Sequence, residues 1–583
     1  MTVTAGAPLL EVEGLTYRYR RATEPAIRDL NLTVGAGDVV LVAGPSGCGK
    51  STLIRAINGL IPHAYPGELS GSVRIEGRST VDLKLRDIAL TVGTVLQDPA
   101  KQIVGSTVES ELAFGPENLG VPRDEIRSRI SQVAARAGIT DLVGRETAAL
   151  SGGEKQLVAT AGTLMMQPRL YVVDEPLANL DPATARRLLA LLRELADRGD
   201  AVVIVEHRVE EALDLRPDRV LYLEEGRERY QGPLPGFLRI ADPAAVKLPF
   251  EVVLERVRAE WRQGIEPDGA PGAHGAPSRA SADGDPPRLA FRGVHAGYGS
   301  REVLGGVDAR LGRREIVAVL GPNGSGKTTL FRTAMRLLPT TGGEVLVDGA
   351  SIAGRSVADL ATVFGYVFQS TSQMLFARTV YEELVFGPRN LGRDPGTFEG
   401  IVADALRRTA LDGLEGIRER PPLTLSYGQQ KRLALAIALA LEPPTLILDE
   451  PSAGQDHRTS NAFMAEVVAI PGLESIYLVT HDVDLALTHA DRILLLREGR
   501  IVADGPPAAV IEDEERWIAC NLRPTSLLRA NARWRMTEGR LLGAEELARR
   551  IVGQEGLRGA PGNGEGGPQR GKPRAGGNPK ALT

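Results

Sequence analysis

The sequence is poor in cysteine and has no long hydrophobic run. Its 583 residues include two cysteines, Cys48 and Cys520, which are too few for a disulfide framework, a zinc cluster or an iron–sulfur centre. This scarcity is typical of a reducing compartment. The longest apolar run spans residues 433–441, far short of the roughly 20 residues that a membrane-spanning helix needs. We expect a cytoplasmic protein without a membrane span or a signal peptide.

The sequence also lacks a large excess of charge of either sign. It has 69 basic and 74 acidic side chains, a formal net charge of −5, so no nucleic-acid partner is expected. With 43% hydrophobic and 25% charged residues the composition is that of an ordinary globular protein. At roughly 150 residues per domain, the length indicates about four structural units.

The same series of motifs occurs twice along the chain. Residues 44–51 read GPSGCGKS and residues 321–328 read GPNGSGKT, with their lysines 327 − 50 = 277 positions apart. Further pairs follow in the same order at offsets of 272 to 275: Gln97 and Gln369, Ser151 and Ser426, Asp174 and Asp449, His207 and His481. Such a repeat indicates a tandem duplication of one α/β domain.

Composition divides the chain into segments. Residues 264–287 are rich in Gly, Pro and Ala and have the character of a flexible linker, with a reach of roughly 25–30 Å. Each domain is followed by an amphipathic helical appendage, which could dock on its own half or on the other. The Gly- and Pro-rich end favours a disordered tail over a nucleic-acid or lipid-binding arm. The predicted units are domain 1 (9–235), its appendage (236–263), the linker (264–287), domain 2 (288–506), its appendage (507–552) and the tail (553–583).

Each repeat has a glycine-rich loop between an expected strand, 39–43 or 316–320, and an expected helix. This context is the one a P-loop needs, because backbone N–H groups then surround phosphate oxygens at a helix N-terminus. Lys50 and Lys327 would reach the terminal phosphates, and Ser51 and Thr328 would bind Mg²⁺. The predicted loop residues are Gly44, Pro45, Ser46, Gly47, Cys48, Gly49, Lys50, Ser51 and Thr52, and Gly321, Pro322, Asn323, Gly324, Ser325, Gly326, Lys327, Thr328 and Thr329.

Two acidic residues end a buried-type strand in each repeat. Asp174 and Asp449 would serve the Mg²⁺ shell, and Glu175 and Glu450 would accept a proton from an attacking water. The alternative is that these carboxylates only cap the strand ends.

A histidine follows a further β-branched strand in each repeat. Of the seven histidines, only His207 and His481 coincide under the repeat. We predict that they orient the γ-phosphate or the water, whereas a lone histidine would more often be structural.

A serine opens a long helical stretch in each repeat, three residues before Glu154 or Gln429. This is the spacing of a capping box, which explains the serine and the acidic or amide residue. Glycine in a first turn costs stability, so its presence favours a place where a ligand approaches the backbone. The predicted second phosphate-binding elements are Ser151, Gly152 and Gly153, and Ser426 and Gly428.

Together these motifs resemble those of ATP-binding cassette (ABC) ATPases over residues 9–235 and 288–506. The resemblance implies two P-loop NTPase domains, each with a helical signature subdomain, that use ATP and Mg²⁺. It also implies that Tyr19 and Tyr298 stack on adenine, with Tyr17 as an alternative to Tyr19, and that Gln97 and Gln369 contact the nucleotide and metal. Two residues depart from the usual pattern of the family. Tyr427 is the second residue of the second signature motif, residues 426–429, and Gln455 lies in the second D-loop, residues 454–456.

In this family two cassettes pair head to tail, and here both would come from one chain. Lys50 would then share its nucleotide with Ser426 and Gly428, and Lys327 would share its nucleotide with Ser151 and Gly153.

The segments after Gln97 and Gln369 are similar to those of energy-coupling factor (ECF) transporter ATPases, importers of vitamins and of nickel or cobalt. Residues 113–120 read AFGPENLG and residues 386–392 read FGPRNLG. The resemblance implies a transmembrane coupling subunit and a membrane substrate-binding subunit as partners, with the chain on the inner face of the membrane. Alternatives are a fused sugar-importer ATPase and a ribosome-associated ATPase of the ABC-F type.

Phe114 and Phe386 each lie seventeen positions after the glutamine, and a glycine and a proline follow each of them. ATP chemistry does not require this tripeptide, so it either packs within the domain or forms a shallow groove. In the second case Gly and Pro would leave room for a partner helix, and Phe would be its apolar anchor.

Overall fold

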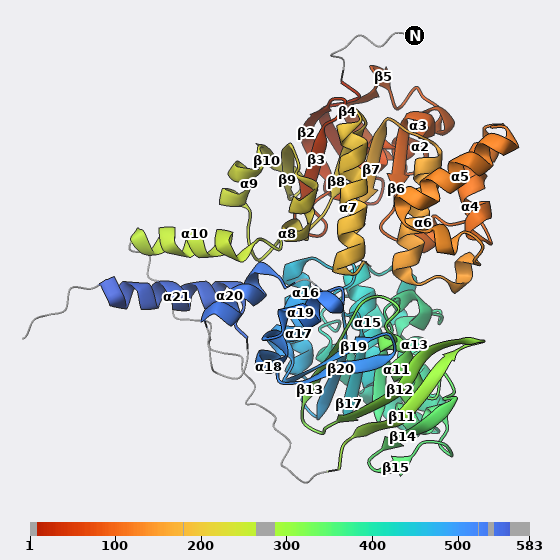
Figure 1. The fold of residues 1–583 in the computed structure, drawn as a ribbon, viewed down its shortest axis with the longest axis vertical. Helices are drawn as coiled ribbons and strands as arrows, with labels where there is room; N and C mark the ends of the chain where they lie inside the picture. Colours follow the sequence, from red (N-terminus) through yellow and green to blue (C-terminus); the bar gives the residue numbers. More distant parts are fainter. Residues whose placement is uncertain (1–7, 179, 264–285, 523, 535–540, 560–583) are drawn as a thin grey trace, which may run out of the picture.

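The structure, a computed structural model, describes residues 8–559 apart from 179, 264–285, 523 and 535–540. It contains two α/β halves of the same topology, one above the other in Figure 1. Within the described part of the chain, no helix has both the length and the apolar character that crossing a membrane requires. The predicted fold class, two tandem P-loop domains, is confirmed.

A six-stranded sheet forms the centre of each half, and the strand order is the same in both. Four of the five strand pairings in each sheet are parallel. The edge strand that comes last in the chain pairs antiparallel with its neighbour. The first sheet runs β10 (Arg227–Gly232), β9 (Arg219–Glu224), β3 (Val39–Ala43), β8 (Ala201–Val205), β7 (Leu170–Asp174), β6 (Val92–Val95). The second runs β20 (Arg500–Gly505), β19 (Arg492–Arg497), β13 (Ile316–Leu320), β18 (Ser475–Val479), β17 (Thr445–Asp449), β16 (Phe364–Val367).

A four-stranded antiparallel sheet packs beside each central sheet. In the first half its order is β2 (Ile27–Val34), β1 (Leu10–Tyr19), β4 (Gly67–Ile75), β5 (Arg78–Ser79). In the second half it is β12 (Arg301–Leu311), β11 (Leu289–Tyr298), β14 (Gly342–Val347), β15 (Ala350–Ser351).

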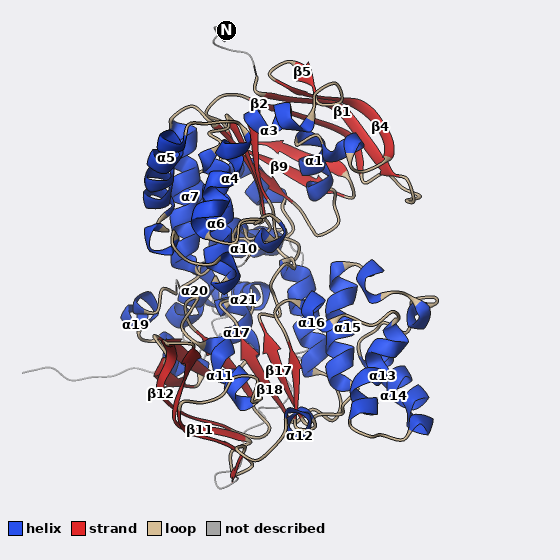
Figure 2. Ribbon diagram, turned by 90° about the vertical axis from the view of Figure 1, so that its right-hand side faces the viewer, coloured by secondary structure: helices blue, strands red, loops and turns tan. Residues whose placement is uncertain are grey.

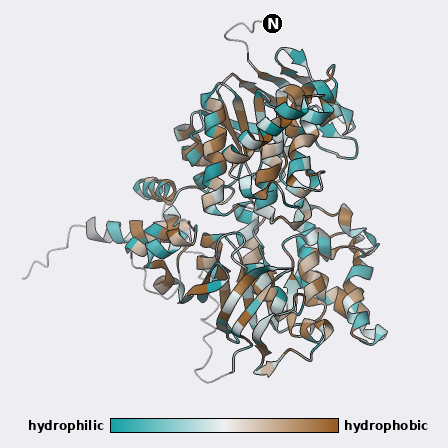
Figure 3. Ribbon diagram, turned by 45° about the vertical axis from the view of Figure 1, so that its right-hand side comes forward, coloured by the Kyte–Doolittle hydropathy of each residue, from teal (hydrophilic) through white to brown (hydrophobic). Residues whose placement is uncertain are grey.

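The central strands are short and apolar because they are covered on both faces. Every residue of β3, β7 and β8, and of β13, β17 and β18, is buried. Runs of Val, Ile and Leu are typical of parallel strands between two layers of helices, and these strands are coloured as hydrophobic in Figure 3. Polar motif residues therefore follow at the strand ends, where the sheet meets solvent.

Helices cover the sheets and form a separate helical subdomain in each half. The covering helices are α1 (Lys50–Ile57), α2 (Leu60–His63), α3 (Leu85–Thr91), α7 (Pro182–Asp197) and α8 (Val209–Ala212), then α11 (Lys327–Ala334), α12 (Val357–Ala361), α16 (His457–Val468) and α17 (Val483–His489). The helical subdomains are α4 (Val108–Asn118), α5 (Arg123–Ala137) and α6 (Gly152–Met165), and α13 (Val380–Asn390), α14 (Phe398–Arg408) and α15 (Tyr427–Leu439). In Figure 2 the two subdomains lie on opposite sides of the molecule.

The appendages join the halves. The first contains α9 (Leu234–Ile240) and α10 (Phe250–Arg262), and the second contains α18 (Pro507–Ile511), α19 (Glu514–Ala519), α20 (Ser526–Trp534) and α21 (Ala544–Gly559). Helices α10 and α21 lie side by side (Figure 1), and Leu547 and Ile551 are buried in the same hydrophobic core as Val253 of α10. The second appendage thus docks on the first half as well as on its own.

Helix α21 continues to Gly559, past the predicted tail boundary at residue 553, whereas the residues that it buries against the first half end at Val552. The rest of the predicted tail, and residues 264–285 of the predicted linker, lie outside the described residues.

Candidate functional site

Both glycine-rich loops have the shape that phosphate binding requires. Each leads from a central strand, β3 or β13, into the N-terminus of α1 or α11. Gly49 and Gly326 precede these helices with φ of 107° and 104°, a conformation that favours glycine. A Cβ on Gly49 would lie 2.6 Å from the carbonyl oxygen of Ala26, so a side chain there would clash.

The loop lysines are buried and point back into their own loops. Lys50 Nζ donates to the carbonyl oxygens of Gly44 (2.7 Å) and Pro45 (2.8 Å). Lys327 Nζ does the same to Gly321 (2.8 Å) and Pro322 (3.0 Å). Burial lowers the pKa of Lys327, although the charges of nearby carboxylates oppose this. Each ammonium group is therefore held where the phosphates of a bound nucleotide would lie.

In the first half, the carboxylates at the end of β7 lie beside a glutamine and a histidine. Gln97 Nε2 donates to Glu175 Oε2 (2.7 Å), and His207 Nδ1 lies 3.7 Å from Glu175 Oε1. Burial opposes ionisation of Glu175, but the hydrogen bond and charge of His207 hold its pKa below the usual value. Burial, with the charge of Glu175, raises the pKa of Asp174 to about 7. The two neighbouring carboxyl groups thus differ in acidity.

The second half holds its glutamate in a different way. Glu450 Oε2 lies 3.0 Å from His481 Nδ1 and also accepts hydrogen bonds from Thr480 Oγ1 (3.1 Å) and the His481 N–H (3.2 Å). Burial raises the pKa of Glu450, but the charge and hydrogen bonds of His481 outweigh it and lower the pKa. Gln369, the counterpart of Gln97, is exposed.

The residues predicted to bind Mg²⁺ suit a hard cation. In the second half Thr328 Oγ1 donates to Asp449 Oδ1 (3.1 Å), so a hydroxyl and a carboxylate oxygen already lie together. Tyr366 OH donates to the other oxygen, Oδ2 (2.9 Å). Oxygen ligands from one or two side chains, completed by phosphates and water, are the set that Mg²⁺ prefers. Burial, with the charge of Glu450, raises the pKa of Asp449 to about 6.

The predicted capping boxes are present. Ser151 Oγ accepts from the N–H of Glu154 (3.3 Å), whose carboxylate accepts from the N–H of Ser151 (2.7 Å). Ser426 and Gln429 form the same pair in the second half. Both helices, α6 and α15, therefore begin at the residue after the serine.

Burial separates the two candidate tyrosines of the first half. Tyr17 is fully buried, and its hydroxyl donates to the carbonyl oxygen of Tyr65 (2.9 Å), so its ring is not free to stack on a ligand. Tyr19 is half-buried, and its hydroxyl accepts from Arg55 (2.7 Å). Tyr298, its counterpart, is exposed. The geometry favours Tyr19 over Tyr17.

The P-loop of the first half contacts the second half directly. The N–H of Ser46 donates to Asp456 Oδ2 (2.9 Å), a D-loop residue 410 positions later in the chain. His207 and His481 line one pocket between the halves, together with Gly454 and Gln455. The motifs of the two halves therefore face each other across one interface.

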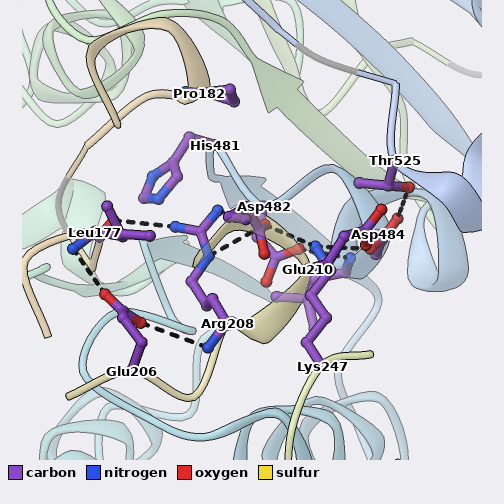
Figure 4. A network of polar contacts seen from close by, with 12 residues as sticks. Leu177, Pro182, Glu206, Arg208, Glu210, Lys247, His481, Asp482, Asp484 and Thr525 are labelled. Atoms are coloured by element: carbon purple, nitrogen blue, oxygen red, sulfur yellow. Dashed lines mark hydrogen bonds and ion pairs between the residues drawn. The ribbon is translucent and has the colours of Figure 1, made fainter. Parts of the chain in front are cut away.

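A buried network of charged groups also crosses this interface, and sequence reasoning missed it (Figure 4). Lys247 Nζ lies 3.0 Å from Glu211 Oε1 of its own half and 2.9 Å from Asp484 Oδ2 of the other. Burial opposes its charge, but Asp484 and Glu211 hold the pKa of Lys247 well above the usual value. Its signal in the sequence is a single lysine in an otherwise apolar segment, residues 244–250, which favours a buried ion pair.

Two phenylalanines of the helical subdomains are exposed. Phe114 on α4 is 52% exposed and Phe386 on α13 is 45% exposed, so neither packs in a core. The adjacent glycines are not open: a Cβ on Gly115 would lie 2.4 Å from Met166 Sδ, and a Cβ on Gly387 would lie 2.8 Å from a Leu441 methyl carbon. The expectation that these glycines leave room for a partner helix is therefore wrong, because they allow close packing within each subdomain.

A sequence profile described as ABC transporter matches residues 27–178 and 304–453, about half of the chain. The chain belongs to the ABC transporter family. It is 36% identical over 559 residues to a protein of Methanosarcina acetivorans that carries the name ABC transporter ATP-binding protein, with 89% of each chain covered. A protein of the same name from Lactiplantibacillus plantarum is 33% identical, with 89% of this chain and 95% of that protein covered.

Among solved structures, CbiO1 from Clostridium perfringens, described as part of the ABC transporter complex CbiONQ, is 33% identical. It aligns with 41% of this chain and 96% of its own chain, at a TM-score of 0.36. As a member of the ABC transporter family, the chain is an ATPase that binds ATP with Mg²⁺.

Proposed function

We propose that this ABC ATPase is the energy-coupling subunit of an ECF-type importer. It would hydrolyse ATP on the inner face of the membrane and drive uptake of a vitamin or a transition-metal ion through separate membrane subunits. The surface that follows Gln97 and Gln369 supports this proposal, since the ATP sites alone are common to all ABC transporters.

The observation that carries the proposal is a matched pair of exposed apolar surfaces. Phe114 lies on the same subdomain as Val104, which is 63% exposed, and Phe386 packs edge-on against Phe376, also 63% exposed. Phe376 is the counterpart of Val104 under the repeat, because the two lie 376 − 104 = 272 positions apart, the same offset that separates Gln369 from Gln97. Exposed aromatic side chains at matched sites are typical of anchors for partner helices. Two such surfaces fit one membrane partner with two cytoplasmic segments.

The proposed chemistry uses two composite sites. ATP at Lys50 would be closed by Ser426 and Gly428 of the other half, and ATP at Lys327 by Ser151 and Gly153. The contact between Ser46 and Asp456 supports this arrangement, because it brings the first P-loop against the second half. Mg²⁺ would be held by Ser51, Gln97 and Asp174, or by Thr328, Gln369 and Asp449, and when bound it neutralises phosphate charge.

Each glutamate would then accept a proton from the attacking water. Glu175 and Glu450 keep lowered pKa values, so they are ionised at neutral pH and can act as bases. His207 and His481 would orient the γ-phosphate or the water beside them. Binding of ATP would close the halves, and hydrolysis would reopen them and move the helical subdomains with their membrane partner.

The test replaces both anchors with a charged residue. We expect Phe114→Asp with Phe386→Asp to leave a folded protein with most of its ATPase activity in solution, because both side chains are exposed and belong to none of the predicted ATP-binding motifs. The same variant should no longer co-purify with a membrane subunit encoded beside it. Ile518→Asp, at a 60% exposed residue of α19, is the matched control and should retain the partner. Unchanged membrane association of the double variant would contradict the proposal.

A further inference from the structure

In the second half, the signature helix is tied to the D-loop that follows the glutamate. Tyr427, the first residue of α15, donates its hydroxyl to the carbonyl oxygen of Ala453 (3.1 Å). One turn further on, Lys431 Nζ donates to the carbonyl oxygens of Pro451 and Ala453 (the latter at 3.2 Å). Two side chains of one helix therefore hold the start of this loop.

The ring of Tyr427 also needs the glycine beneath it. Gly454 has φ +67°, and a Cβ there would lie 3.1 Å from the ring, closer than ordinary van der Waals contact. The unusual tyrosine of the signature and the D-loop glycine thus form one packing unit. Tyr427 remains 45% exposed, so this unit lies at the surface of the second half.

The tied loop reaches the first half's nucleotide site. Two residues after Gly454, Asp456 accepts the hydrogen bond from the Ser46 N–H (2.9 Å) in the first P-loop. Tyr427 lies near that site too. Burial raises the pKa of Tyr427, and the negative charges of Asp98 and Glu175, both in the first half, are close enough to raise it further. The contact between the halves at Ser46 therefore depends on a loop whose position Tyr427 helps to fix.

Among the residues that the structure describes, which leave out Asn179 of the first D-loop, the first half shows no such tie. Gly152 occupies the position of Tyr427 (427 − 275), and Gln156 that of Lys431 (431 − 275). Gln156 is buried, and its Nε2 has no hydrogen-bond partner. The segment before the first D-loop is instead held by residues that follow β8. Leu177 donates its N–H to Glu206 Oε1 (2.9 Å), and its carbonyl oxygen accepts from Arg208 (3.0 Å).

We propose that Tyr427 is a positioning residue for the Lys50 site alone, fixing the second D-loop against the first P-loop through its hydrogen bond to Ala453 and its packing on Gly454. The two ATP sites are then unequal in construction. One is closed by a signature and D-loop that move as a unit, and the other by a signature that is not tied to its D-loop by these contacts. The inference rests on the composite sites proposed above.

The test measures each site separately. After photolabelling with 8-azido-ATP under vanadate trapping, cleavage at a protease site placed within residues 264–285 followed by denaturing electrophoresis separates the halves, so the label on the first half reports the Lys50 site. Tyr427→Phe should lower the first-half label roughly threefold to tenfold, the effect of losing one hydrogen bond, and leave the second-half label unchanged. Tyr427→Gly, which installs the first-half residue, should lower it further.

The matched control is Tyr230→Phe, which also removes a tyrosine hydrogen bond to a backbone carbonyl, that of Pro233 (2.7 Å), but on the outer strand β10. It should change neither label. Ser426→Arg tests the composite site itself: an unchanged first-half label would overturn both proposals. If Ser426→Arg lowers the label while Tyr427→Phe changes neither half, or both halves equally, only the role of Tyr427 is overturned.

Discussion

At the scale of single residues, the two glutamates differ in what surrounds them. Glu175 is bonded to Gln97, with His207 at 3.7 Å, whereas Glu450 is bonded to Thr480 and lies 3.0 Å from His481. Since Gln97 is also a proposed nucleotide contact, we expect the first glutamate to change partner when ATP and Mg²⁺ bind. The second does not depend on Gln369, which is exposed.

We expect Glu175→Gln with Glu450→Gln to retain ATP binding and to lose hydrolysis by roughly 10²-fold or more, because an amide cannot accept the proton of the attacking water. Phosphate release and binding of a fluorescent ATP analogue measure the two effects. Each single variant reports one site. Turnover of the double variant close to that of the wild type would remove both glutamates from the role of base.

Lys431 predicts a dependence of stability on pH. Burial lowers its pKa to about 7, and only the charge of Glu450 opposes this. Between about pH 7 and 10 the unfolded chain holds this proton and the folded chain does not, so the contribution of Lys431 to stability rises with pH. Lys431→Met should flatten the rise of the melting temperature over this window. An unchanged slope would mean that the lysine stays charged when folded.

The choice between Tyr17 and Tyr19 shows what the sequence could not supply at this scale. Residues two apart on a strand point to the same face, so the pattern around β1 allows either ring to reach the nucleotide. The decision comes from Tyr65, whose carbonyl oxygen accepts from Tyr17 and whose loop buries that ring. This contact joins residues 48 positions apart, and no local pattern encodes it.

At the scale of helices and strands, the local motifs were reliable guides. The sequence predicted the strands before each P-loop, the strands that end in Asp174 and Asp449, and both capping boxes. Each of these elements is recognised from residues close together in the chain: an apolar run, a glycine-rich turn, or a serine three residues before Glu or Gln. The end of α21 was not predicted. Its last turns are rich in glycine, a residue of low helix propensity, so the sequence pattern did not favour a helix there.

Helix α21 should therefore control the stability of the first half. Leu547 and Ile551 are fully buried in the core that includes β3 and β8. We expect Leu547→Ala to lower the free energy of unfolding by about 2–5 kcal/mol, the cost of a cavity of that size. Glu545→Ala on the first turn of the same helix is the control and should have little effect. Calorimetry would show which transition moves, and an unshifted first-half transition would contradict this assignment.

At the scale of the whole molecule, the contacts between the halves predict that the linker is not needed for their association. Protein cut within residues 264–285 should elute as one complex without nucleotide. Lys247→Ala should weaken that complex by at least about a hundredfold, because it leaves Glu211 and Asp484 buried without their cation. Arg458→Ala removes an exposed ion pair between the halves, with Asp242 (2.7 Å), and should have a small effect. Binding of the two purified halves, measured by fluorescence, decides between them.

These inter-half contacts are the part of the site that sequence reasoning could not reach. The repeat and the resemblance implied a head-to-tail pair, but the partners of Ser46 and Lys247 depend on how two folded halves dock. Asp456 and Asp484 are more than 230 positions from their partners in the first half. The departure at Tyr427 acquires a meaning only when its contact with Gly454 is seen.

The place of α21 in the first half's core also sets an order of events during synthesis. The core around α10 includes Leu542, Leu547 and Val552, which the ribosome makes nearly three hundred residues after Val253. The first half emerges early and can form its sheet. The apolar face of α10, however, is covered only after the end of the second half has been synthesised. A nascent chain arrested before residue 541 should therefore expose apolar surface on α10, and chaperones that bind such surface should hold it until translation reaches α21.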